Sequence, residues 1–188
     1  DDAWTAVTWV AEHAAEIGAD PARLAVGGDS AGANLATVAC LMARDRGGPP
    51  IAYQLLIYPS LDLTEAGFAL PSHKENGESG YVVSNADLRL WAAHYLSGGA
   101  DPADPHISPL QAPDLSGLPT AMVVTAEYDP LRDHGEEYSR RLNEAGVSSE
   151  LRRYDGQFHA FFILPAALDA ARECMDEVAG ALRKALGV

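Results

Sequence analysis

The chain has 188 residues, 47% of them hydrophobic and 21% charged, and this length and composition favour one globular domain with a substantial core. A formal net charge of −14 repels phosphate backbones, so we expect no nucleic-acid partner. No run of about eighteen uncharged apolar residues occurs, and we therefore expect no membrane span. The two cysteines form no CxxC pair and the six histidines form no HExxH motif, so the sequence predicts no metal and no cofactor.

The predicted elements alternate between helices and short apolar strands. In chain order, we predict a helix at 2–17, a strand at 24–26, a helix at 31–44, a strand at 51–59, a strand at 120–129, a helix at 133–145, a strand at 148–156 and a helix at 165–186. Asp133, with Glu136 three residues later, is expected to begin its helix with a capping box. The strand at 148–156 is more polar and is expected near a sheet edge. Strands separated by helices in this way predict an α/β fold, with a parallel sheet covered on both faces.

One long connection separates the second predicted strand from the third. Residues 60–118 combine glycine, proline and serine clusters with one convincing helix at 85–96. A connection of this length between strands suggests an inserted lid or binding element. In parallel sheets of this kind, active residues gather on the loops beyond the carboxyl ends of the strands.

The stretch "AVGGDSAGANLA" at 25–36 contains a G-x-S-x-G pattern centred on Ser30. It follows a predicted strand and opens a predicted helix, which is the context of a nucleophile elbow. Gly28 and Gly32 are expected to leave room for the sharp turn. The helix N-terminus offers free N–H groups to a developing anion, and the backbone N–H of Ala31 is the predicted oxyanion donor. The alternative is a glycine-rich turn that only packs a helix against a sheet.

Two later residues complete a candidate catalytic triad. Asp129 ends the third predicted strand in "AEYDPLRDHG", where a carboxylate can orient an imidazole ring. Asp133 and Glu127 are lesser candidates for this role, and Asp133 fits a helix cap better. His159 follows the fourth predicted strand in "YDGQFHAFF", where three phenylalanines would hold its ring and exclude water. The alternatives are a helix cap or a surface turn for Asp129, and a partly buried histidine in an aromatic patch for His159.

The three residues occur in the order Ser, Asp, His, each after a separate predicted strand, and this is the order found in α/β-hydrolases. In the predicted reaction, neutral His159 takes the proton of Ser30 as the serine oxygen attacks a carbonyl carbon. Asp129 fixes the tautomer of the ring and stabilises the imidazolium, and water then releases the acyl group.

The motifs "GDSAGANLA", "LLIYPSLD", "DPLRDHG" and "GQFHAF" resemble those of the hormone-sensitive-lipase-like esterases, also called bacterial family IV, of the α/β-hydrolase fold. The resemblance extends along nearly the whole chain. It implies that Ser30, Asp129 and His159 are nucleophile, acid and base, and that the substrates are carboxylic esters with short to medium acyl chains. It also implies that residues 61–104 contribute to a cap over the site.

The family has a His-Gly-Gly-Gly motif upstream of the nucleophile, which supplies further oxyanion N–H groups. This chain has Gly-Gly pairs at 27–28, 47–48 and 98–99, and none of them follows a histidine. We therefore expect the chain to be the C-terminal part of a larger protein, without the N-terminal strands. Loss of one oxyanion donor can lower a rate about a hundredfold. The chain alone can therefore lack activity even if its triad is intact.

Two other interpretations stay open at this point. A non-catalytic ligand-binding relative would keep the fold, although such relatives lose the histidine that this chain has. An amidase, a formamidase or an acyltransferase would keep the triad and change the bond or the acceptor. For the esterase, we expect a small-molecule ester as the partner and a cytoplasmic location. The oligomeric state stays open between a monomer and a homo-oligomer.

Overall fold

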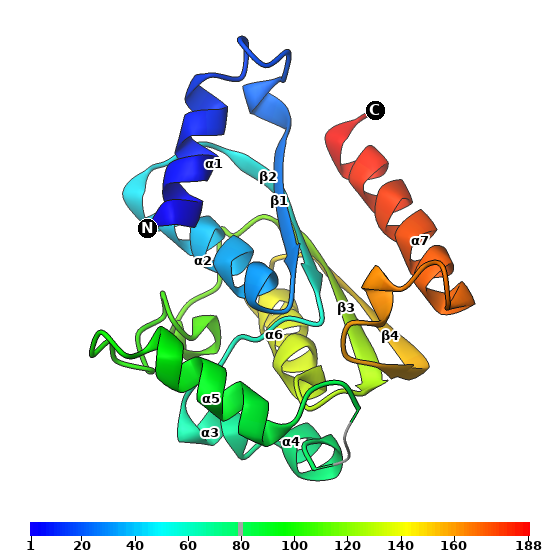
Figure 1. The fold of residues 1–188 in the computed structure, drawn as a ribbon. Helices are drawn as coiled ribbons and strands as arrows, with labels where there is room; N and C mark the ends of the chain where they lie inside the picture. Colours follow the sequence, from blue (N-terminus) through cyan, green and yellow to red (C-terminus); the bar gives the residue numbers. More distant parts are fainter. Residues whose placement is uncertain (79–80) are drawn as a thin grey trace.

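Four parallel strands form the sheet at the centre of the computed structural model, which describes residues 1–78 and 81–188 (Figure 1). The strands lie in the order β1 (Leu24–Asp29), β2 (Ile51–Ile57), β3 (Thr120–Tyr128) and β4 (Ser149–Phe158). The prediction of an α/β fold with a parallel sheet is confirmed. The polar strand β4 lies at one edge of the described sheet, as predicted, and β1 lies at the other.

Helices cover both faces of this sheet. Those of the described residues are α1 (Asp2–Glu12), α2 (Ala31–Arg46), α3 (Glu65–Phe68), α4 (Pro71–Asn76), α5 (Asn85–Tyr95), α6 (Arg132–Glu144) and α7 (Asp169–Leu186), with short 3-10 turns at Pro21–Arg23, Pro109–Gln111 and Phe161–Ile163. Cys40 in α2 and Cys174 in α7 are buried free cysteines. Among the described residues, no helix combines the length and apolar character that crossing a lipid bilayer requires.

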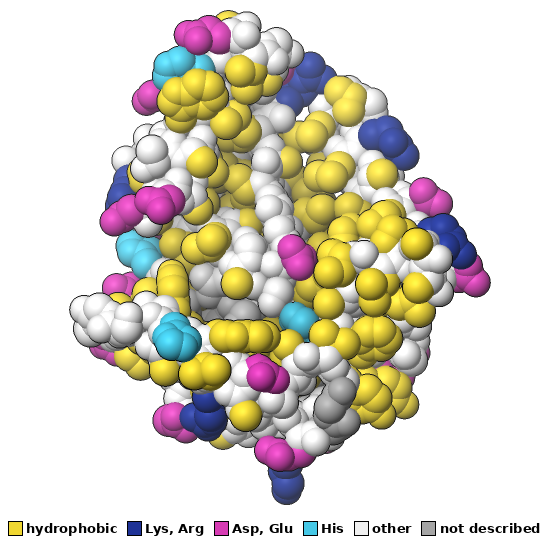
Figure 2. Space-filling model, viewed as in Figure 1, with side chains coloured by type: hydrophobic (Ala, Val, Ile, Leu, Met, Phe, Trp, Pro, Cys, Tyr) yellow, Lys and Arg dark blue, Asp and Glu magenta, His cyan; other side chains and the backbone are white. Residues whose placement is uncertain are grey.

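The core has two layers because side chains alternate between the faces of β2 and β3. On one face, Leu56 and Val123 pack with apolar residues of α2 and α6. On the other face, Leu55 is joined by Val124 in a cluster with α7. Figure 1 accordingly shows α2 and α6 on one side of the sheet and α7 on the other. Hydrophobic side chains also gather on the face between α1 and α7 (Figure 2).

The connection after β2 places α3, α4 and α5 beyond the carboxyl ends of the strands (Figure 1). The predicted helix at 85–96 is confirmed as α5, which begins with a capping box between Ser84 and Asp87. The short helices α3 and α4 were not predicted. The predicted cap at 61–104 includes residues 79–80, which lie outside the described residues.

Several predicted boundaries are wrong at places where a distant partner or a turn overrides local periodicity. The first helix ends at Glu12 instead of residue 17, and the last helix begins at Asp169 instead of residue 165. Helix α6 begins at Arg132 after Leu131, whose side chain makes no cap, and Oγ of Ser72 accepts the first-turn N–H of Asp133 at 3.2 Å. The carboxylate of Asp133 accepts the backbone N–H of Ser72 at 2.8 Å, so the predicted cap is wrong because a residue of α4 occupies that carboxylate.

Candidate active site

Ser30 joins β1 to α2 in a backbone conformation that side chains rarely adopt. Its φ is +52°, so the strain of the turn falls on Ser30 itself. A Cβ at Gly28 would lie 2.4 Å from the carbonyl carbon of Gly32, so only glycine lets β1 approach α2 this closely. A Cβ at Gly32 would meet no described atom within 4 Å. The expectation that both glycines leave room is therefore right for Gly28 and wrong for Gly32.

The side chains of Ser30, His159 and Asp129 form one continuous hydrogen-bonded row. Nε2 of His159 lies 3.1 Å from Oγ of Ser30, and Nδ1 of the same ring lies 2.8 Å from Oδ2 of Asp129. Oδ1 of Asp129 accepts the backbone N–H of Leu131 at 2.8 Å. Asp129 is fully buried and His159 is 5% exposed. A row of acid, imidazole and hydroxyl at these distances can activate the serine oxygen as a nucleophile.

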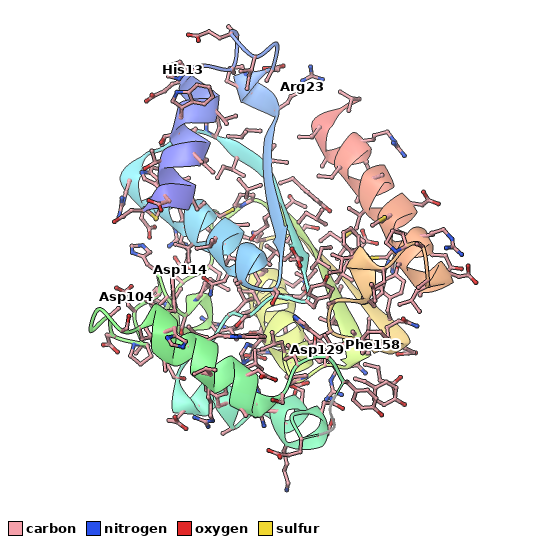
Figure 3. The ribbon with its side chains drawn as sticks, viewed as in Figure 1. His13, Arg23, Asp104, Asp114, Asp129 and Phe158 are labelled. Atoms are coloured by element: carbon pink, nitrogen blue, oxygen red, sulfur yellow. The ribbon has the colours of Figure 1, made fainter. Side chains whose placement is uncertain are left out.

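The ends of three different strands bring these residues together. Ser30 follows β1, Asp129 follows β3 and His159 follows β4. Tyr128 and Phe158, which directly precede the acid and the histidine, are register partners at the ends of neighbouring parallel strands. Figure 3 shows Asp129 and Phe158 at this shared end of the sheet. The placement of the site at the carboxyl ends of the strands agrees with the expectation from the sequence.

The two lesser acid candidates have other partners. Oε2 of Glu127 accepts the backbone N–H of Gly156 at 2.6 Å. The carboxylate of Asp133 accepts from Ser72 and pairs with Arg132. Asp129 is the candidate whose carboxylate reaches the imidazole ring.

Tyr58 is a residue of this site that the sequence reasoning missed. Its fully buried ring lies 4.7 Å from the ring of His159 and 6.1 Å from the ring of Phe161, measured between centroids. Its hydroxyl lies 3.5 Å from Oδ2 of Asp29. Burial, with help from that carboxylate, raises the pKa of Tyr58, so the phenol stays neutral. The signal that could have found it is an aromatic residue directly after β2, in "LLIYP".

The N-terminus of α2 adds positive potential to the site. Ala31 is the first residue of this helix, and it lines the same cavity as Ser30. Backbone N–H groups in a first helical turn have no partner within the helix, and the helix dipole favours a negative charge there. Ala31 therefore lies beside Ser30 at the positive end of this helix dipole.

A cavity of about 310 Å³ opens beside Ser30. Its wall is largely apolar and includes side chains from α2, α3, α5 and the loop before α6, namely Leu35, Phe68, Leu88, Trp91, Tyr95 and Leu131. This size is at the lower end of the range for small-molecule sites, about 300–1,000 Å³. Within the described residues, no group of three or more His, Cys, Asp or Glu side chains is arranged to hold a metal ion.

Known proteins are similar to this chain in fold and sequence. A family model described as the alpha/beta hydrolase fold matches residues 1–163. The carboxylesterase NlhH of Mycobacterium tuberculosis is 43% identical over 190 residues, which cover 99% of this chain and 58% of that protein. The ethyl acetate hydrolase of Pseudomonas putida is 37% identical over 187 residues, with coverage of 99% and 58%. A hyperthermophilic esterase from the archaeon Pyrobaculum calidifontis matches with a TM-score of 0.91 and 43% identity, over 97% of this chain and 58% of that one.

The chain spans 58% of the length of these relatives, and the match covers nearly all of its own length. The motifs, the parallel sheet and the relatives agree with one another. This chain belongs to the hormone-sensitive-lipase-like esterases of the α/β-hydrolase fold.

Proposed function

We propose that this chain carries the catalytic triad of a serine carboxylesterase, with Ser30 as nucleophile, His159 as base and Asp129 as acid. The hydrogen-bonded row of these side chains, at 3.1 and 2.8 Å, is the observation that carries the proposal. The names of the relatives, a carboxylesterase and an ethyl acetate hydrolase, support the same activity. The presence of a histidine in the row disfavours a non-catalytic binding role.

The reaction follows from the protons of the row. Nδ1–H of His159 donates to Asp129, which leaves Nε2 free to take the proton of Ser30 as Oγ attacks the ester carbonyl carbon. The N–H of Ala31 donates to the oxyanion of the tetrahedral intermediate. The imidazolium returns its proton to the departing alcohol, and an acyl-enzyme remains. Water, deprotonated by His159, then attacks the acyl carbon, the bond from this carbon to Oγ breaks as the imidazolium returns the proton to Oγ, and the carboxylic acid leaves.

The cavity beside Ser30 supports esters with short to medium acyl chains as substrates. Its apolar wall suits an alkyl chain, because burial contributes about 0.8 kcal/mol per CH₂ group. Leu88, Trp91 and Tyr95 of α5 and Phe68 of α3 supply part of this wall. These helices belong to the segment 61–104, which we propose as a cap-type insertion in a single catalytic domain.

We also propose a cytoplasmic location, and a homo-oligomer is the alternative to a monomer. Neither of the two buried cysteines forms a disulfide, as is common for proteins of reducing compartments. Fractionation of cells and analytical ultracentrifugation of the purified protein test these two points.

Covalent labelling tests the nucleophile. A serine-reactive phosphonate should add one mass increment to the intact protein, and Ser30→Ala should abolish this increment. Ser60→Ala is the matched control, because Ser60 also lines the cavity and is within reach of a bound reagent. The Ser60→Ala variant should still be labelled at Ser30. Undiminished labelling of Ser30→Ala would refute the assignment of the nucleophile.

A substrate series tests the bond and the chain length. Nitrophenyl esters from acetyl to dodecanoyl should be hydrolysed fastest at short to medium lengths, and matched amides should be much poorer substrates. A wide preference for amides would replace the esterase by an amidase with the same triad.

A further inference from the structure

Two histidines that the proposed reaction does not use form a buried pair behind the cavity. His73 of α4 and His134 of α6 are each 1% exposed, and their Nε2 atoms lie 3.3 Å apart. Nδ1 of His134 lies 3.2 Å from the backbone nitrogen of Leu61, and Nδ1 of His73 lies 2.7 Å from Oδ1 of Asn85. His134 also lines the cavity, so the pair reaches the proposed substrate site.

The outer partners determine which nitrogen of each ring carries the proton. The N–H of Leu61 donates to Nδ1 of His134, so the proton of this ring lies on Nε2. That Nε2–H donates to Nε2 of His73, whose own proton therefore lies on Nδ1 and is donated to Oδ1 of Asn85. Nδ2 of Asn85 in turn donates to the carbonyl of His73 at 2.9 Å. This chain of donors and acceptors is complete only when both rings are neutral.

The helix that carries His73 also holds the loop of the catalytic acid. Oγ of Ser72 donates to the carbonyl of Pro130 at 2.6 Å, and its backbone N–H donates to the carboxylate of Asp133. Nδ2 of Asn76 lies 3.4 Å from the carbonyl oxygen of Asp129 and donates to it. Through these bonds and the histidine pair, α4 connects the loop of Asp129 to α5 and to the segment after β2.

We propose that His134, His73 and Asn85 form a neutral positioning unit, which holds the cavity wall of α5 against the loop of the catalytic acid and opens when acid protonates a ring. Its kinetic consequences rest on the proposed esterase function, whereas its hydrogen bonds do not. A second proton on His134 would set Nδ1–H against the N–H of Leu61. A second proton on His73 would set two Nε2–H groups against each other. Either new proton would face another donor, and the charge would be buried.

The surroundings of the pair favour neutral rings. Burial, followed by the charge of a protonated His73, lowers the pKa of His134 from 6.5 to about 4. Burial also lowers the pKa of His73, against the opposing effect of its hydrogen bond to Asn85. Charged groups of neighbouring segments act in both directions. Asp62 and Asp129 raise the pKa of His134. Asp129 and Asp133 raise the pKa of His73, and Arg89 lowers it. Burial prevails, so both rings are still neutral in the folded protein at pH 6.5, and the unit is lost as the pH falls toward about 4.

NMR spectra that correlate ring nitrogens with ring protons test the pair without any need for activity. At neutral pH, we expect opposite neutral tautomers, with Nε2–H on His134 and Nδ1–H on His73. The single variants His134→Asn and His73→Asn assign the signals. The same tautomer on both rings, or a charged ring at neutral pH, would overturn the proposal.

Kinetics test the positioning role. For a hexanoyl ester, His73→Asn should raise KM about tenfold and change kcat less than about threefold, whereas an acetyl ester should be affected little. In the unaltered protein, KM for the hexanoyl ester should rise as the pH falls toward about 4, and this rise should vanish in His73→Asn. His94→Asn, on the exposed face of α5, is the control and should keep both parameters. An unchanged KM and pH profile in His73→Asn would refute positioning. Absence of all esterase activity would refute the proposed function instead, and the NMR spectra would still decide on the pair.

Discussion

The substitution Asp129→Asn should leave the triad in place and disable its base. Oδ1 of Asp129 accepts the N–H of Leu131, so the new amide must turn its oxygen toward Leu131 and its NH₂ group toward His159. The amide then donates to Nδ1 of His159 and moves the ring proton to Nε2, where it points at Oγ of Ser30. A ring in this tautomer cannot take the serine proton.

We expect kcat to fall about 10⁴-fold, the size that this exchange has in a serine protease triad. This loss corresponds to about 5.4 kcal/mol of transition-state stabilisation, because each tenfold change in rate corresponds to about 1.36 kcal/mol. KM should change little, since the carboxylate of Asp129 faces His159 and Leu131 and does not line the cavity.

The assay is hydrolysis of nitrophenyl acetate, combined with the rate at which a phosphonate labels Ser30. Glu127→Gln is the matched control, because it makes the same exchange of carboxylate for amide two residues away. Its oxygen can still accept the N–H of Gly156, so it should keep kcat within about threefold. A variant Asp129→Asn that retained about a tenth or more of kcat would refute both the tautomer argument and the role of Asp129.

Two further predictions concern packing and burial. Gly28→Ala should lower the free energy of unfolding by about 1–3 kcal/mol, because its Cβ would lie 2.4 Å from the backbone of Gly32 and α2 would have to move. Gly32→Ala is the control, and an equal loss in both variants during urea unfolding would contradict this account. Burial raises the pKa of Cys174 to about 11 and also raises that of Cys40, so neither should react with iodoacetamide at pH 8 in the folded protein. Mass spectrometry should show both alkylated in urea, and modification of the native state would count against their burial.

Much of the fold could be predicted because its signals are local. The apolar runs that became β2 and β3, and the Pro and Gly residues around them, act over neighbouring positions. The elbow at Ser30 could also be recognised, since the motif lies between a strand and a helix. The helices α3 and α4 escaped prediction because they have four and six residues, too few to show a helical period.

Long-range contacts explain the remaining differences. Asp133 has the local pattern of a helix cap, yet its carboxylate binds Ser72, which lies 61 positions away in the chain. The aromatic residue after β2 marks Tyr58 as unusual, but its support of His159 could not be predicted, because the contact forms only when β2 and β4 enter the same sheet.

The sequence by itself determined the order of the strands and of the longer helices, and it indicated Ser30, Asp129 and His159 as candidates for a triad. Those conclusions depend on periodicity and turn residues, which adjacent positions specify. Only the tertiary structure decided which of three nearby carboxylates meets His159, and how His73 and His134 share their protons. These outcomes depend on side chains that are far apart in the chain and close in space, where burial and hydrogen-bond partners select one arrangement.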